Sequence, residues 1–135
     1  MNKGLLLQEE QGQEMHRDMD TIRQIALKTA ELEYGEALTG LTDISKEAFA
    51  MHSTWMEEAG LIKATITEYL SGETPHVVIF RLTWEGCEFA DAVKNDTLWR
   101  KAKDTVIKPT ASFTFGLLKE WLKSELQHGF PTLRT

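Results

Sequence analysis

The side chains that could perform covalent or metal chemistry in this sequence are few and scattered. The chain has four histidines and one cysteine, and no HxxxH or HExxH spacing joins any of the histidines, which are His16, His52, His76 and His128. A metal site needs ligands at helical or turn spacing, or a cysteine pair, so we expect no metal. His52 falls on the inner face of a predicted helix beside Trp55, which favours a buried ring bonded to a backbone group.

Cys87 is the clearest candidate nucleophile. It lies in the first turn of a predicted helix, where the helix dipole favours a thiolate, but the flanking Glu85 and Glu88 oppose thiolate formation, so we expect a small packed side chain. No GxxxxGK[ST] or GxGxxG phosphate loop is present. Paired acids such as Asp18 and Asp20 are typical of helix caps and solvated faces. We therefore expect a non-enzyme without a cofactor.

Basic and hydroxyl side chains on one predicted helix and one predicted hairpin could contact DNA. Arg, Lys, Ser and Thr side chains bind phosphates and base edges in protein–DNA interfaces. The residues of this kind are Lys46, Ser53 and Thr54 on the outward face of the helix, with Lys63 and Arg81 on the hairpin. The same segments also carry acids that would repel phosphate, namely Glu47, Glu57, Glu58 and Glu73.

The same surface could instead bind a protein. Large apolar side chains that stay exposed act as anchors in protein interfaces. We place Phe49 at the margin of the outward helix face, and Val77 and Ile79 on the outer face of the second strand. These three residues are the candidate anchors for a protein partner.

Hydrophobic periodicity and capping residues predict the elements that position these side chains. Helical spacing predicts helices over about 18–33, 45–59, 84–93, 96–106 and 112–128. Alternation over 62–67 and the β-branched run over 76–82 predict a hairpin. Residues 37–41 are either a loop or a brief edge strand. Ser45, Thr83 and Asp96 are the expected helix N-caps.

The order of these elements predicts an α+β fold that is mostly α. A helix that ends in Ala-Gly-Leu-Ile and leads directly into a two-stranded ribbon is typical of a winged helix, in which that helix is the recognition element. We expect a winged helix (helix, helix, two-stranded β-hairpin wing) with additional C-terminal helices; the alternative is a general α+β domain with a hairpin packed on helices. The expected parts are a loose leader over 1–15, a winged-helix domain over 16–94, and a C-terminal helical extension over 95–135 packed on the same domain.

The composition is that of an ordinary soluble globule. A length of 135 residues, of which 41% are hydrophobic and 27% charged, fits one domain. These values exclude a disordered chain, a collagen-like repeat and a disulfide-rich secreted scaffold. The apolar run Leu5 to Leu7 is too short for a signal peptide, and no window is long enough to span a membrane. We expect a cytoplasmic protein that does not bind membranes.

The net charge of -6 is unevenly distributed along the chain. Residues 1–93 carry 7 Lys and Arg against 17 Asp and Glu, whereas residues 94–135 carry 8 against 4. The acidic part argues against general nucleic-acid binding, in which cations displace counterions from phosphate. The basic part is either a solvated face that balances the acidic domain, which we favour, or a phosphate-contacting surface. Its many aromatic residues predict packing on the winged core or on a second copy, and we expect a homodimer through the C-terminal helices.

Several short motifs resemble a family of bacterial and prophage proteins, domain of unknown function 2513. They cover residues 16 to about 126 and are His16-Arg17-Asp18-Met19-Asp20 with Ile22-Arg23, Met51-His52, Glu58-Ala59-Gly60-Leu61-Ile62, Arg81-Leu82-Thr83-Trp84-Glu85-Gly86 with Phe89 and Asp91-Ala92, and Asn95-Asp96-Thr97-Leu98-Trp99. The most specific are RDMD and RLTWEG, since AGLI is common among winged-helix regulators of the MarR and PadR kinds. The resemblance implies a small winged-helix-like domain, often on mobile elements, with no assigned activity.

Two functions follow as hypotheses. The first is a small, non-enzymatic winged-helix regulator of prophage or mobile-element type that binds double-stranded DNA. The alternative is a winged-helix interaction module that binds a host or phage protein without contacting DNA.

Overall fold

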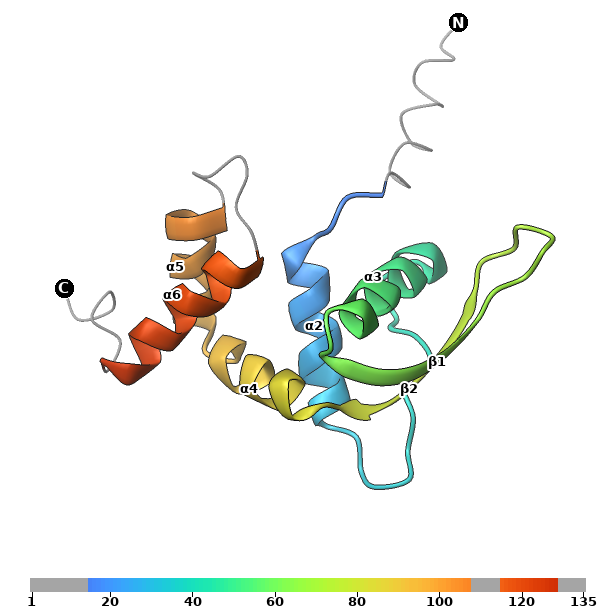
Figure 1. Cartoon of the computed structure of the whole chain (residues 1–135), viewed down its shortest axis with the longest axis horizontal. Helices are drawn as coiled ribbons and strands as arrows, with labels where there is room; N and C mark the ends of the chain where they lie inside the picture. Colours follow the sequence, from blue (N-terminus) through green and yellow to red (C-terminus); the bar gives the residue numbers. More distant parts are fainter. Residues whose placement is uncertain (1–14, 108–114, 129–135) are drawn as a thin grey trace, which may run out of the picture. The chain divides into compact units, whose positions relative to one another are not determined.

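The protein is described by a computed structural model over residues 15–107 and 115–128, whose elements are shown in Figure 1. In chain order these are α2 (Met19–Ala30), α3 (Lys46–Glu58), β1 (Ile62–Thr67), β2 (His76–Leu82), α4 (Trp84–Val93), α5 (Asp96–Ala102), the π-helix η1 (Lys103–Ile107) and α6 (Phe115–Gln127). The described fold is mixed α+β and mostly helical, with one two-stranded antiparallel sheet, which confirms the predicted class. Residues 1–14 of the expected leader and the expected helix start at residue 112 lie outside the described residues.

The chain divides into two compact units, and each is described by itself. The first unit ends at Gly86 and contains α2, α3 and the hairpin; the second begins at Cys87 and contains α5, η1 and α6. Helix α4 begins in the first unit and continues into the second. The expected packing of the C-terminal extension on the first domain stays a prediction.

Side-chain caps begin the two helices of the first unit. Asp18 caps α2, and its side chain accepts a hydrogen bond from the backbone N–H of Asp20 at 2.9 Å. Ser45 caps α3 as predicted, and its Oγ accepts from the N–H of Ala48 at 3.0 Å. α2 ends at Ala30, three residues before the predicted end, because its run of buried positions stops at Thr29.

The hairpin is antiparallel and carries α2 and α3 on one side, with its turn extending beyond α3 in Figure 1. Its register pairs Ile62 with Leu82 at one end and Thr67 with His76 at the other. Leu38 forms an isolated bridge with Ile79, with reciprocal N–H to carbonyl bonds of 2.9 Å. The segment predicted as a loop or brief edge strand therefore provides a single strand-like position.

The core of the first unit lies between the two helices and the inner side of the hairpin. The buried apolar side chains here are Met19, Ile22, Ile25 and Ala26 from α2, Phe49, Ala50 and Met56 from α3, and Leu61, Ile62, Val77, Ile79 and Leu82 from the hairpin. Residues 31–45, which connect the two helices, contain turns and the bridge at Leu38 but no helix.

The end of α3 and the beginning of α4 are joined through Thr83. Its backbone N–H donates to the carbonyl oxygen of Leu61 at 3.0 Å. Its Oγ1 donates to the carbonyl oxygen of Gly60 at 2.6 Å and accepts from the N–H of Gly86 at 3.0 Å. The hydroxyl therefore acts as the predicted N-cap of α4 while it binds the end of the preceding helix.

The second unit has its own apolar core. Phe89, Val93, Leu98, Trp99, Leu118 and Leu122 are among its buried residues. α5 is capped by Asn95, whose Oδ1 accepts from the N–H of Leu98 at 2.8 Å, and not by Asp96 as predicted. Cys87 is exposed, so the expectation that it is packed is wrong. Within the described ranges, no helix has the length and apolar character needed to cross a membrane.

Candidate nucleic-acid interface

The two strands of the hairpin direct alternate side chains to the core and to solvent. Ile62, Val77 and Ile79 are buried, whereas Lys63 and Thr65 are exposed. We call the solvent side the outer hairpin face; its residues are Lys63, Thr65, Val78, Phe80 and Arg81.

The outer hairpin face carries two cations that lie opposite each other. Lys63 and Arg81 are register partners, and both side chains are exposed. Like charges in this position destabilise a strand pair. Neither strand contains an Asp or a Glu, although residues 15–86 hold 12 acids against 6 Lys and Arg. The acids of this unit therefore lie outside the strands, and none of the strand residues neutralises the pair.

Phe80 is an extra residue in β2. Because the register pairs Lys63 with Arg81 and Ala64 with Ile79, Phe80 has no partner in β1. Such a β-bulge bends a strand and re-aims its side chains. It accounts for two consecutive exposed residues, Phe80 and Arg81, where strict alternation would bury one of them. Phe80 could not be identified from the sequence, because nothing in the run HVVIFRL marks a bulge.

Helix α3 does not present the predicted DNA contacts together. Ser53 is completely buried and its Oγ makes no hydrogen bond within the described residues, so its predicted exposure is wrong. Thr54 is half-buried, and its Oγ1 donates to the carbonyl oxygen of Ala50 at 2.8 Å. Lys46 is exposed in the first turn. The other charged residues of this helix, all acidic and exposed, are Glu47, Glu57 and Glu58.

The buried face of α3 differs from the predicted one because this helix contacts α2 and the hairpin at once. Its buried residues are Phe49, Ala50, His52, Ser53 and Met56, whereas Trp55, expected beside His52 on the inner face, is half-exposed. Packing against two elements buries a wider sector of a helix than the single stripe formed by residues spaced three and four apart. The prediction of a buried His52 with backbone partners is confirmed.

The three predicted anchors for a protein partner are also buried. Phe49 and Val77 are each 3% exposed and Ile79 is fully buried, so their predicted exposure is wrong. Ile79 belongs to the inner side of the hairpin, where it pairs with Ala64 and with Leu38. The run HVVIFRL has apolar residues on both faces, so alternation alone could not assign its inner side.

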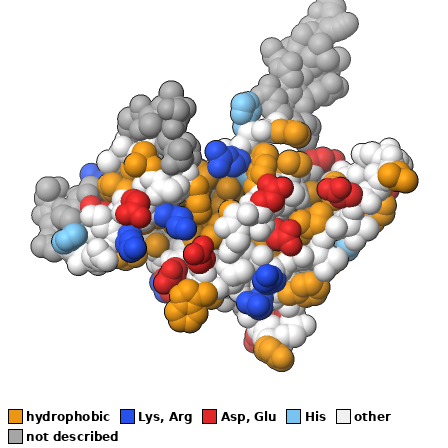
Figure 2. All heavy atoms as spheres, viewed as in Figure 1, with side chains coloured by type: hydrophobic (Ala, Val, Ile, Leu, Met, Phe, Trp, Pro, Cys, Tyr) orange, Lys and Arg blue, Asp and Glu red, His pale blue; other side chains and the backbone are white. Residues whose placement is uncertain are grey.

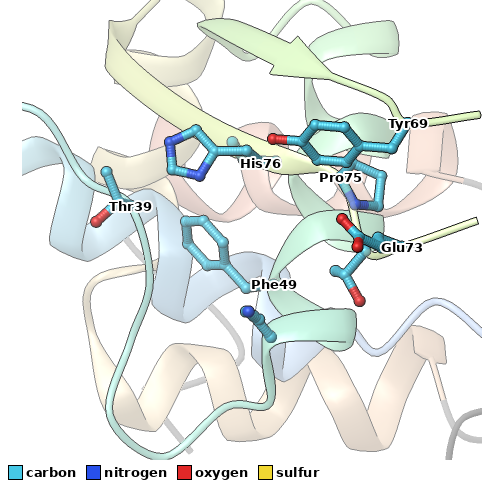
Figure 3. A pocket seen from close by; sticks show the side chains of 9 residues that line it. Thr39, Phe49, Tyr69, Glu73, Pro75 and His76 are labelled. Atoms are coloured by element: carbon cyan, nitrogen blue, oxygen red, sulfur yellow. The ribbon is translucent and has the colours of Figure 1, made fainter. Parts of the chain in front are cut away.

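Lys46, Phe49 and Val77 nevertheless line one pocket of about 780 Å³ between the start of α3 and the turn end of the hairpin. The other lining residues are Thr39, Tyr69, Glu73, Thr74, Pro75 and His76. In Figure 3 the ring of Phe49 points into the pocket toward His76, with Pro75 and Glu73 on the other side. The pocket thus has an apolar floor and a mixed-charge rim, as binding pockets commonly do.

Charges of both signs lie on the face of the molecule seen in Figure 2. In the view of Figure 2, Lys and Arg side chains are separated by Asp and Glu side chains. Across 15–107 and 115–128, no group of three or more His, Cys, Asp or Glu residues could hold a metal ion. The outer hairpin face is therefore distinguished by its cations, its hydroxyl and its aromatic ring, not by a metal site.

Comparison with known proteins identifies relatives without an assigned activity. Residues 16–112 match a family described as "Hypothetical protein (DUF2513)". An uncharacterized protein of Haemophilus influenzae is 30% identical over 109 residues, which cover 78% of this chain and 91% of that protein. No solved structure matches the chain.

Proposed function

This chain belongs to the DUF2513 family, whose function is unknown, and we propose from its own geometry that it is a small DNA-binding protein whose contact surface is the outer hairpin face. The observation that carries the proposal is the pair Lys63 and Arg81, which are opposite in register, exposed, and located on strands without acids. A phosphate placed between two such cations relieves their repulsion and releases counterions from the DNA. The proposed role is non-enzymatic.

We interpret the first unit as a winged-helix domain that contacts DNA through its wing. α3 leads directly into β1, β1 and β2 form the wing, and Leu38 contributes a third strand position. Helix α2 precedes α3, but residues 31–45 separate the two helices, whereas a helix-turn-helix joins its two helices by a turn of about 3–4 residues. Because α3 presents Glu57 and Glu58 to solvent, we assign the phosphate contacts to the hairpin and not to α3.

The test is fluorescence anisotropy of labelled duplex DNA, both a random pool and the upstream region of the gene, at about 50 and about 200 mM salt. We expect binding that weakens steeply with salt. Replacing one phosphate-contacting cation lowers the slope of log affinity against log salt by about 1. We expect this change for Lys63→Gln and for Arg81→Gln.

Lys28→Gln is the matched control. Lys28 is exposed in the same unit but belongs to helix α2 and not to the hairpin, and its Nζ lies 3.7 Å from Oε1 of Glu31. This variant should bind as the unchanged protein does. Equal losses in all three variants would indicate only a general charge effect and would contradict the proposed surface. Preference for the upstream fragment over the random pool would support a regulatory role.

A second candidate function is favoured by the pocket that joins Lys46, Phe49 and Val77. In this hypothesis the domain binds a protein partner there and does not contact DNA. Substituting Phe49 or Ile79 by a charged residue cannot test it, because both are buried and the domain would unfold. Absence of DNA binding even at about 50 mM salt would favour this second candidate over the first.

A further inference from the structure

The bulge at Phe80 places an aromatic ring next to the two cations of the outer hairpin face. Phe80 is 51% exposed, although a phenylalanine in a strand of a small domain ordinarily helps to form the core. It directly precedes Arg81 in the chain, and Arg81 is the register partner of Lys63. Side chains of neighbouring positions on paired strands lie within about 5–8 Å of each other.

The rest of the outer hairpin face adds small and hydroxyl side chains. Beyond the inward-facing pair Ala64 and Ile79, Thr65 and Val78 form the next register pair on this face, and Thr65 is exposed. An aromatic ring, two cations and a short polar surface without acids are the components of a single-strand binding surface, on which bases stack and the backbone follows the positive charge. Duplex DNA keeps its base faces covered, so it cannot use an exposed ring without being kinked.

We infer that the outer hairpin face binds single-stranded DNA, with an unpaired base stacked on Phe80 and the adjacent phosphates at Lys63 and Arg81. This inference rests on the proposed DNA-binding function and specifies the state of the DNA that is bound. Charge complementarity supports this occupant, because the ligand is a polyanion and the two strands carry cations but no carboxylates. The surface is small, so binding is expected to be weak and strongly dependent on salt.

The experiment compares labelled oligothymidine of about 15 nucleotides with a duplex of the same length, using the full chain at about 50 mM salt. Stacking of one base on an aromatic side chain corresponds to an affinity change of roughly 5-fold to 150-fold. We expect the single strand to bind more tightly than the duplex. Phe80→Ala should weaken the single strand by that factor and leave the duplex unchanged, and Phe80→Trp should restore the affinity.

Tyr34→Ala is the matched control, because Tyr34 is a completely exposed aromatic residue of the same unit that lies outside the hairpin. This variant should bind the single strand and the duplex as the unchanged protein does. Thermal unfolding of each variant checks that the fold is kept. If Phe80→Ala has no effect while Lys63→Gln still weakens binding, stacking is refuted and the DNA-binding proposal stands. If Phe80→Ala weakens both DNAs equally, the ring is a wedge in duplex DNA and the single-strand inference is wrong. If neither DNA binds, both proposals fail.

Discussion

His52 connects the beginning of α2 with α3 through both nitrogens of its ring. The backbone N–H of Asp18 donates to Nε2 at 2.9 Å, so Nε2 carries no proton. Nδ1 therefore carries the proton and donates to the carbonyl oxygen of Ala48 at 2.8 Å. His52 is 5% exposed, and its ring packs edge-on against the ring of Trp55 with 5.1 Å between the ring centroids. A histidine that could have suggested catalysis is thus fully used in holding two helices together.

We predict that this contact contributes to the free energy of unfolding of the protein. His52→Leu keeps the volume of the side chain but leaves the N–H of Asp18 without its acceptor. The bond is part-buried, and losing a typical hydrogen bond costs about 0.5–1.5 kcal/mol of the free energy of unfolding. Urea denaturation should show this loss, whereas His76→Leu, at an exposed position, should stay within about 0.5 kcal/mol. Equal stability of the His52 variant and the unchanged protein would contradict the assigned role.

At the scale of elements, the motifs that carry the family resemblance lie at the junctions between helices and strands. The AGLI and RLTWEG segments meet where Thr83 binds the carbonyl oxygens of Gly60 and Leu61. The RDMD and Met51-His52 segments meet at the bond from Asp18 to His52. These motif residues therefore join helices and strands to one another, and they do not indicate which surface binds a partner.

Gly86 gives this interpretation a quantitative test. A Cβ at this position would overlap the carbonyl oxygen of Leu61, the acceptor for Thr83. Alanine favours a helix over glycine by up to about 1 kcal/mol, but forcing a group into a filled space costs about 1–3 kcal/mol. We expect the overlap to dominate, so that Gly86→Ala lowers the unfolding free energy.

The control for this substitution is Gly40→Ala, because an added Cβ there would meet no atom within 4 Å and the backbone is not left-handed. Its effect should be within about 0.5 kcal/mol. A Gly86→Ala protein that is more stable than the unchanged chain would show that helix propensity outweighs the contact with Leu61. Chemical denaturation followed by circular dichroism is sufficient to measure both variants.

At the scale of the whole molecule, an acidic part is followed by a basic part. Residues 1–93 contain 17 acids, whereas residues 94–135 contain 8 Lys and Arg. The second unit buries Trp99, Leu118 and Leu122 in its own core, which accounts for part of its aromatic and apolar content. Leu117 and Leu126 of α6 remain 49% and 43% exposed, and these are the side chains that a second copy could cover.

The expected homodimer is therefore predicted to depend on α6. Replacing Leu117 and Leu126 together by Glu should convert a dimer to a monomer, because charged groups are costly to bury in an interface. Static light scattering of the full chain measures the change in mass. Tyr34→Glu, a charge placed on an exposed residue of the first unit, is the control that should leave the mass unchanged. A dimer that persists in the double variant would place the interface elsewhere.

The sequence by itself determined the helices, the hairpin and most of their caps. These features depend on neighbouring residues: Ser45 caps α3 because its hydroxyl reaches a nearby backbone N–H, and glycine at position 60 adopts a positive φ of 78° after the helix. The predicted class and family membership rested on this local information and were confirmed. The proposed contacts Lys63 and Arg81 were also recognisable, since each is a cation flanked by apolar residues of a predicted strand.

Only the tertiary structure decided which faces are buried. Ser53, Val77 and Ile79 were assigned to solvent because an amphipathic pattern shows which residues share a face, while the neighbours that pack on each face determine burial. α3 has two such neighbours, and β2 is apolar on both sides, so neither pattern had a unique solution. The bulge at Phe80 results from the pairing of two distant segments, and for that reason the ring beside Lys63 and Arg81 became visible only in the folded chain.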